Sequence, residues 1–386
     1  MTNVNRQKEL TRTHPSHRVT TRGCVLALGL ATLLSPSAAS AGSLDFPARG
    51  HGISLGNSKQ FKGLRFNFAD RGVERVDGFT FSLWIPRDSE QAVVRGICLG
   101  LVGPSAGTLQ GLAIGGVGVA GDRFDGVAAG IVGVGSERLT GIALGGVGVG
   151  AGGELRGVAI GGLGVGAGGG LRGVAIGGLG AGAGEDIDGL VVGGLGAGAG
   201  ENLRGAVIGG LGAGAGKDVT GVLVGGVGAG AGGRMRGLVI GGVGAGAQDM
   251  EGLAVGGVGA GAGTNLTGVA LCGGGAGAGE DLTGLAVGGI GAGAGKRIRG
   301  IVVGGLGAGA PEITGLAAGG LHVRCHRLTG MAASGWVWAD RELTGLSIGV
   351  LNMTSRLKGV QLGLLNHAGN NPRPLRWLPI LNVHLR

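Results

Sequence analysis

One glycine recurs along most of this chain at a nearly constant interval, and we call it the anchor glycine. After Gly96 the interval is 14 to 16 residues. Such a period is typical of repeat architectures, in which each unit packs chiefly against its two neighbours. The sequence therefore predicts one long stack of similar units. The anchor glycines are Gly63, Gly78, Gly96, Gly111, Gly126, Gly141, Gly157, Gly173, Gly189, Gly205, Gly221, Gly237, Gly252, Gly268, Gly284, Gly300, Gly315, Gly330, Gly345 and Gly359.

The residues that flank the anchor alternate in character, as they do on a β-strand. In the unit around Gly205, the apolar Leu203 and the polar Arg204 precede the anchor, which predicts one side chain in and the next out. A helix is opposed because each glycine costs it about 1 kcal/mol relative to alanine. Positions one and three after the anchor are aliphatic in most units, while the position between them becomes Gln361 in the last unit. We therefore expect the middle position to face outward.

A pair of glycines follows four and five residues after the anchor, for example Gly177 and Gly178. Because glycine enters positive φ freely, we expect a corner or a bulge at this pair. An alternating Gly-Ala run and a polar turn complete the unit. Each unit then becomes one coil of two short strands and two turns, and the coils stack in parallel about 4.8 Å apart.

The predicted fold class is all-β, an elongated β-solenoid of about twenty coils of 15–16 residues. Its length would be on the order of 95 Å. Of the 386 residues 100 are glycine, yet 43% are hydrophobic, so the chain has enough aliphatic side chains to bury a core. Aromatic residues make up 3% and tyrosine is absent, so valine, leucine, isoleucine and alanine must fill that core.

The alternative fold is a transmembrane β-barrel in which each unit supplies one strand and one turn. A meander of this kind has alternate turns at opposite ends, whereas the turns of this sequence all look alike. Aromatic girdles are missing as well, because the chain has only four tryptophans. Ladders of identical residues instead favour parallel, in-register stacking.

The N-terminus is typical of a secretory signal peptide. Residues 1–41 have a basic start, an apolar run at 25–34 and a small-residue ending, which predicts cleavage before Gly42. We expect residues 42–95 to be an N-terminal capping region with the first atypical repeats and residues 96–329 to be the glycine-rich repeat array. Residues 330–386 would be atypical terminal repeats and a C-terminal cap. The predicted location is exported: the cell envelope, outer surface or exterior of a bacterium.

Net charge gives no argument for nucleic acid as a partner. The formal charge is +9, but residues 1–41 carry five basic residues and one acidic residue, and residues 321–386 carry eight and two. Residues 42–320 are therefore close to neutral, and the high isoelectric point describes the two ends of the chain. The candidate partners are other envelope or surface components and further copies of the chain itself.

The sequence contains no recognisable catalytic group and no cofactor motif. His322, Cys325 and His326 are weak candidates for a zinc or copper site, because three donor side chains lie within five residues. On a strand, the two histidines would face one way and the cysteine the other. A polar turn is the favoured interpretation. Cys98 and Cys272 lie in or beside aliphatic segments, which predicts small buried thiols.

The last two units resemble a known type of repeat. Residues 345–352 (GLSIGVLN) and 359–366 (GVQLGLLN) are similar to the GLQIGLxN repeats of uncharacterised bacterial surface-repeat proteins. The ending at 377–382 (WLPILN) is similar to their terminal W-x-P-x-x-N segment. The resemblance is looser in the Gly-Ala-rich middle. It implies an exported envelope or surface protein and supplies no activity.

Together these features predict a protein that is not an enzyme, namely an exported repeat protein that serves as a structural scaffold, spacer or adhesive surface. An outer-membrane β-barrel or pore is the alternative function. Gly-Ala runs such as residues 212–216 resemble silk-like stacking segments, so self-association also stays open.

Overall fold

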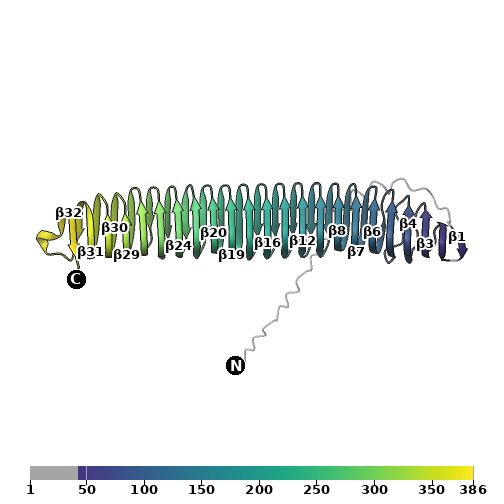
Figure 1. Ribbon diagram of the computed structural model, residues 1–386, viewed down its shortest axis with the longest axis horizontal. Coiled ribbons are helices and arrows are strands. Elements are labelled where there is room, and N and C mark those ends of the chain that lie inside the picture. Colours follow the sequence, from purple (N-terminus) through teal and green to yellow (C-terminus); the bar gives the residue numbers. More distant parts are fainter. Residues whose placement is uncertain (1–41, 49, 386) are drawn as a thin grey trace, which may run out of the picture. The chain divides into compact units, whose positions relative to one another are not determined.

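The structure is a computed structural model that describes residues 42–48 and 50–385. The predicted signal peptide, residues 1–41, lies outside the described residues. The described chain forms an elongated stack of coils (Figure 1), with no α-helix among the described residues. It is a β-solenoid of about 19 coils, which confirms the predicted fold class and makes the predicted barrel alternative wrong. The deciding observation is that successive coils pair in parallel, as Gly157 does with Gly173 and Gly173 with Gly189.

The stack begins with an antiparallel strand. β1 (Ser43–Ala48) pairs antiparallel with β2 (His51–Gly56). From β2 onward the pairing is parallel, through β3 (Gln60–Asn67), β4 (Arg75–Ser82) and β5 (Val93–Gly100).

In the middle of the stack each coil has a longer strand that contains the anchor and a shorter strand that contains the Gly-Ala run. The longer strands are β10 (Leu155–Gly161), β12 (Leu171–Gly177), β14 (Ile187–Gly193), β16 (Leu203–Gly209), β18 (Val219–Gly225), β22 (Leu266–Cys272), β24 (Asp281–Gly288), β26 (Arg297–Gly304) and β28 (Glu312–Gly319). The shorter strands are β9 (Gly148–Ala151), β11 (Gly164–Ala167), β13 (Gly180–Ala183), β15 (Gly196–Ala199), β17 (Gly212–Ala215), β21 (Gly259–Ala262), β23 (Gly275–Ala278), β25 (Gly291–Ala294) and β27 (Gly307–Gly309).

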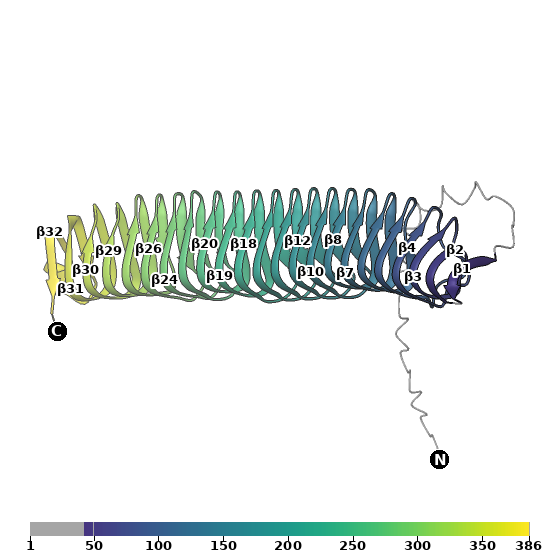
Figure 2. The same cartoon turned by 45° about the vertical axis from the view of Figure 1, so that its right-hand side comes forward.

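Elsewhere the short strand of one coil continues into the long strand of the next. These continuous strands are β6 (Ser105–Gly115), β7 (Gly118–Gly130), β8 (Gly133–Gly145), β19 (Gly228–Gly241), β20 (Gly244–Gly256), β29 (His322–Ala333), β30 (Trp336–Ile348) and β31 (Leu351–Ala368). After a 3₁₀ turn, η2 (Arg373–Leu375), the strand β32 (Trp377–His384) pairs antiparallel with β31. Figure 2 shows from a second side that the coils follow one another without a break.

The core consists of in-register ladders of aliphatic side chains. In the coil around Gly173, Leu171 and Ala175 are fully buried, and Ala181 of the short strand is 7% exposed. The same three positions are buried from coil to coil. Burying each leucine stabilises the fold by roughly 1.5–3 kcal/mol relative to an exposed one, so the stack gains a similar term with every coil.

The second residue after the anchor faces inward. The prediction that it faces outward is therefore wrong. Ala175 is fully buried, whereas its neighbour Ile176 is 38% exposed, and Gln361 at the equivalent position of the last unit is fully buried. The physical reason is that the two-residue period runs straight through the anchor from Leu171 to Ala175. At this inward position the core holds side chains from alanine to leucine, as at Leu223, and the aliphatic side chain that follows it points outward.

The predicted corner lies at the Gly-Gly pair, because the long strand ends at Gly177 and the short strand begins at Gly180. The expected positive φ, however, occurs at the anchor and not at this pair. Gly173 has φ +125°, and all twenty anchors have positive φ. The pair is glycine for a different reason, close approach of backbone. A Cβ on Gly177 would collide with the carbonyl oxygen of Gly180, and one on Gly178 would collide with that of Gly162 in the preceding coil.

Candidate functional site

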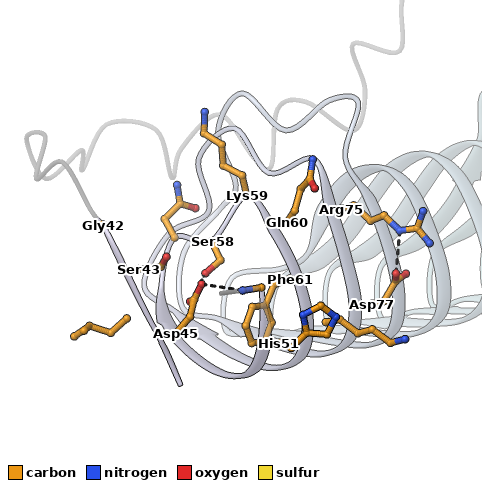
Figure 3. Close-up of a pocket in the computed structure, with 14 residues that line it drawn as sticks. Gly42, Ser43, Asp45, His51, Ser58, Lys59, Gln60, Phe61, Arg75 and Asp77 are labelled. Carbon is orange, nitrogen blue, oxygen red and sulfur yellow. Dashed lines mark hydrogen bonds and ion pairs between the residues drawn. The ribbon is translucent and has the colours of Figure 1, made fainter. Parts of the chain in front are cut away.

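A hollow lies at the N-terminal end of the described chain, beside β1 and the turn that follows β2. It has a volume of about 1010 Å³ and is lined by both acidic and basic side chains (Figure 3). Its two carboxylates already have partners, because Asp45 accepts a 2.8 Å hydrogen bond from Ser58 and Asp77 lies 2.9 Å from Arg75. Hydrogen bonds from Ser54, and secondarily from Ser58 and Gly50, lower the pKa of Asp45. These carboxylates therefore organise local turns.

The interior of the first coils contains a cluster of polar side chains beside its apolar ones. Asp70 accepts hydrogen bonds from Arg65 at 2.6 Å, from Asn67 at 2.7 Å and from Ser82 at 2.8 Å. Arg65 is 1% exposed and occupies the inward position that Ala175 occupies in the middle of the stack. Because an arginine on a strand is usually exposed, this cluster was not predicted from the sequence. A buried charge needs such partners.

The last coils also have a polar interior, built from amides. Asn352, Asn366 and Asn382 are fully buried. The side-chain amide of Asn352 donates to Oδ1 of Asn366 at 2.7 Å, and Asn366 donates to the carbonyl oxygens of Gly363 and Leu378 at 3.0 and 3.2 Å. This ladder links the final coil to β32. The Asn of the GLxN pattern was the sequence signal for it.

The three weak metal candidates do not converge. Cys325 is 2% exposed and points into the core, where burial raises the pKa of its thiol to about 12. His322 is exposed, and His326 lies 2.9 Å from Asp340 on the surface. Across residues 42–48 and 50–385, no three His, Cys, Asp or Glu side chains are grouped so that they could hold a metal ion. As for the other thiols, Cys98 is buried and Cys272 is half-buried.

Aromatic side chains gather on the outer surface of the last short strands. Trp336 and Trp338 stack with their ring centroids 5.6 Å apart, and the guanidinium of Arg324 lies 4.9 Å from the Trp338 ring. Trp336 and Trp338 are at the outward positions of the coil that correspond to Gly307 and Gly309 two coils earlier. The flat glycine surface of the short strands therefore ends at a raised aromatic and cationic rim.

Charged side chains lie along the turn between the Gly-Ala run and the next anchor. They pair from one coil to the next, as Lys217 does with Glu201 at 2.9 Å and Arg297 does with Asp281 at 2.6 Å. The hydrogen bond from Arg297 lowers the pKa of Asp281, and that to Glu201 raises the pKa of Lys217. Side chains at the position before the anchor, such as Arg172, are exposed as well. We call this side of the solenoid the charged edge.

The remaining outer surface is apolar over most of the length of the stack. In the thirteen units with anchors from Gly111 to Gly300, the first nine residues after each anchor include no charged residue, amide, serine or threonine. The large aliphatic side chains among them point outward. We call the exposed ones the apolar flank: Ile114, Val127, Ile131, Ile142, Leu144, Val147, Ile160, Leu163, Ile176, Leu179, Leu195, Ile208, Leu211, Val227, Val243, Val258, Ile290, Ile301 and Leu306.

The apolar flank is held as a regular ladder by the backbone. The N–H groups of Leu179, Leu195 and Leu211 each donate a 2.7 Å hydrogen bond to the equivalent carbonyl of the preceding coil. These leucines are 49%, 50% and 54% exposed. The sequence does contain this ladder, but sequence reasoning missed its outward orientation because large aliphatic side chains were assigned to the core.

Within the described ranges, no helix is both long enough and apolar enough to span a bilayer. Comparison of the chain with protein-family models, with curated proteins and with solved structures found no match.

Proposed function

We propose that this protein is a non-enzymatic repeat protein of the bacterial envelope or cell surface, whose solenoid is a structural scaffold or spacer. The observation that carries the proposal is the parallel pairing of equivalent residues from coil to coil, which continues across local bulges. Equivalent residues are paired from β5 through β31. Each repeat therefore adds one similar coil, and the repeats together determine the length of the solenoid. With coils about 4.8 Å apart, 19 coils extend roughly 90 Å.

Export is supported by the sequence of residues 1–41 and by the resemblance of the last two units to bacterial surface repeats. The test is to express the full chain with a C-terminal epitope tag in a bacterial host and to fractionate the cells. The expected result is tag in the envelope or the medium, and tag in the cytosol for a variant that lacks residues 2–41. Cytosolic full-length chain would contradict the proposal.

The spacer role is tested by removing whole coils. Deletion of residues 190–237 removes three units of 16 residues and joins equivalent positions. A spacer predicts that the variant folds, reaches the same compartment and is shorter by about 14 Å in electron micrographs. A variant that unfolds or keeps the original length would show that the coils are not independent spacing units.

A further inference from the structure

The apolar flank is too large to be an ordinary feature of a monomer. Its thirteen coils extend about 60 Å along the axis, and the chain path from the first to the sixth position after the anchor is about 15 Å. This path bends at the Gly-Gly corner, so the area is at most roughly 900 Å². The largest apolar patch on a typical monomer is about 300–600 Å². A stable interface buries about 800 Å² on each partner, so this flank has the area of one complete interface.

The regularity of the flank identifies the kind of partner that fits it. Its side chains are arranged in rows one coil apart, with the same aliphatic types repeated at Leu163, Leu179, Leu195 and Leu211. A surface fits such rows along their whole length only if it has the same period of about 4.8 Å. A second copy of this chain has that period. A two-fold pair would also bury the same residues on both partners and so close upon itself.

The charge distribution agrees with a protein partner better than with a lipid surface. Surfaces that lie on membranes combine apolar residues with Lys and Arg that attract anionic lipids. Residues 42–320 are close to neutral, and their charges lie on the charged edge, where Lys217 and Arg297 are already paired with acids of the neighbouring coil.

We propose that two copies of this protein associate face to face through their apolar flanks, with the charged edges turned to solvent. This inference goes beyond the scaffold role and does not depend on where the protein is located. Pairing removes the apolar flank from water on both partners, and it leaves the ends of each solenoid free.

The test uses two matched double variants of the full chain. Leu179→Lys/Val227→Lys places two charges on the apolar flank three coils apart, and Thr220→Lys/Thr267→Lys places two charges on the charged edge at the same separation. Sedimentation equilibrium in detergent-free buffer should give a dimer for the parent chain and for the threonine variant. The flank variant should be monomeric, with its Kd for self-association raised at least 100-fold.

Several results would overturn the proposal. One is a parent chain that stays monomeric at all concentrations up to about 100 µM, which is a hundred times a micromolar Kd. Another is equal self-association of the parent and the flank variant. A third is a monomeric parent that binds phosphatidylglycerol vesicles and loses this binding in the flank variant, because the flank would then be a lipid surface. Circular dichroism verifies that each variant is folded. If the two lysines prevent folding of the flank variant, Leu179→Gln/Val227→Gln replaces it.

Discussion

Nη2 of Arg65 lies 2.6 Å from Oδ1 of Asp70 inside the first coils, at a level of the core where later coils bury alanine or valine. Arg65 has only 1% of its side chain exposed, so the ion pair is separated from solvent. Breaking such a pair leaves an uncompensated buried charge. The polar interior therefore makes the first coils depend on both partners.

Replacing one partner of this pair should destabilise the N-terminal coils. We expect Asp70→Ala to lower the free energy of unfolding by about 3–5 kcal/mol, because Arg65 loses its counter-ion in the core. Denaturant unfolding followed by circular dichroism measures the change. Arg156→Ala, which removes an exposed pair with Glu154, is the matched control and should change stability by less than about 1 kcal/mol. Equal effects of the two variants would contradict the buried role.

Two glycines of one unit should respond differently to the same substitution. Gly205 is an anchor with φ +119°, and a Cβ there would collide with the carbonyl oxygen of Gly189. Gly212 faces open space on the outer side of the short strand. We expect Gly205→Ala to destabilise the fold by at least about 1–3 kcal/mol and Gly212→Ala to be nearly neutral. Thermal unfolding of the two variants separates them, and similar losses would refute the assigned difference.

The glycines of each unit also show how far the sequence could predict the fold. The constant period of the anchors was enough to predict parallel coils, since position-matched residues stack only in register. The sequence does not distinguish a glycine required by positive φ, such as Gly173, from one required by close backbone contact, such as Gly178. Both needs select the same residue, so positive φ was assigned to the wrong glycine, although the corner does lie at the Gly-Gly pair.

The orientation of the side chains was predicted less well, and with it the candidate interface. Large aliphatic residues such as Ile176 were placed in the core and small ones such as Ala175 outside, which is the usual order. In this coil the order is reversed after the anchor, because Ala175 is in phase with the buried Leu171 and Ile176 is out of phase with it. Arg65 and Gln361 were missed as core residues for the same reason, because polar side chains on a strand are usually exposed. The correct orientation could be predicted only by continuing the two-residue alternation of the strand through the anchor glycine.

Alkaline pH should destabilise the solenoid through its buried thiols. Burial, with a smaller contribution from Asp70, raises the pKa of Cys98 from 9.0 to about 12. The folded state holds the neutral thiol, so its contribution is complete below pH 9 and is lost as the pH rises from 9 toward 12. The loss is about 1.4 kcal/mol per pH unit for one thiol.

The variant Cys98→Val should show a smaller decrease in stability than the parent chain between pH 9 and pH 11, as measured by the denaturant midpoint at each pH. The parent and the variant should have the same pH dependence between about pH 7 and pH 8, below the range in which the thiol of the unfolded chain ionises. An identical slope for both proteins above pH 9 would rule out this role of Cys98.

The amide ladder at the other end should control the attachment of β32. Asn366→Ala removes a donor to the carbonyl oxygen of Leu378 and the acceptor for Asn352, all inside the core. We expect a loss of about 1–3 kcal/mol, with faster amide hydrogen exchange confined to β31 and β32. Asn202→Ala in an exposed turn is the control, and exchange in β32 should not respond to it. Unchanged exchange of β32 in Asn366→Ala would contradict the predicted attachment.

The central claim is that the second residue after each anchor points into the core and the third residue points outward, and two adjacent residues test it most directly. Val207 is fully buried and Ile208 is 41% exposed. Thermal unfolding by circular dichroism should show that Val207→Lys loses the cooperative β-transition, because the lysine would be buried without a partner. Ile208→Lys should unfold at nearly the parent temperature. The opposite result, a stable Val207→Lys and an unfolded Ile208→Lys, would contradict both the fold of the coil and the apolar flank derived from it.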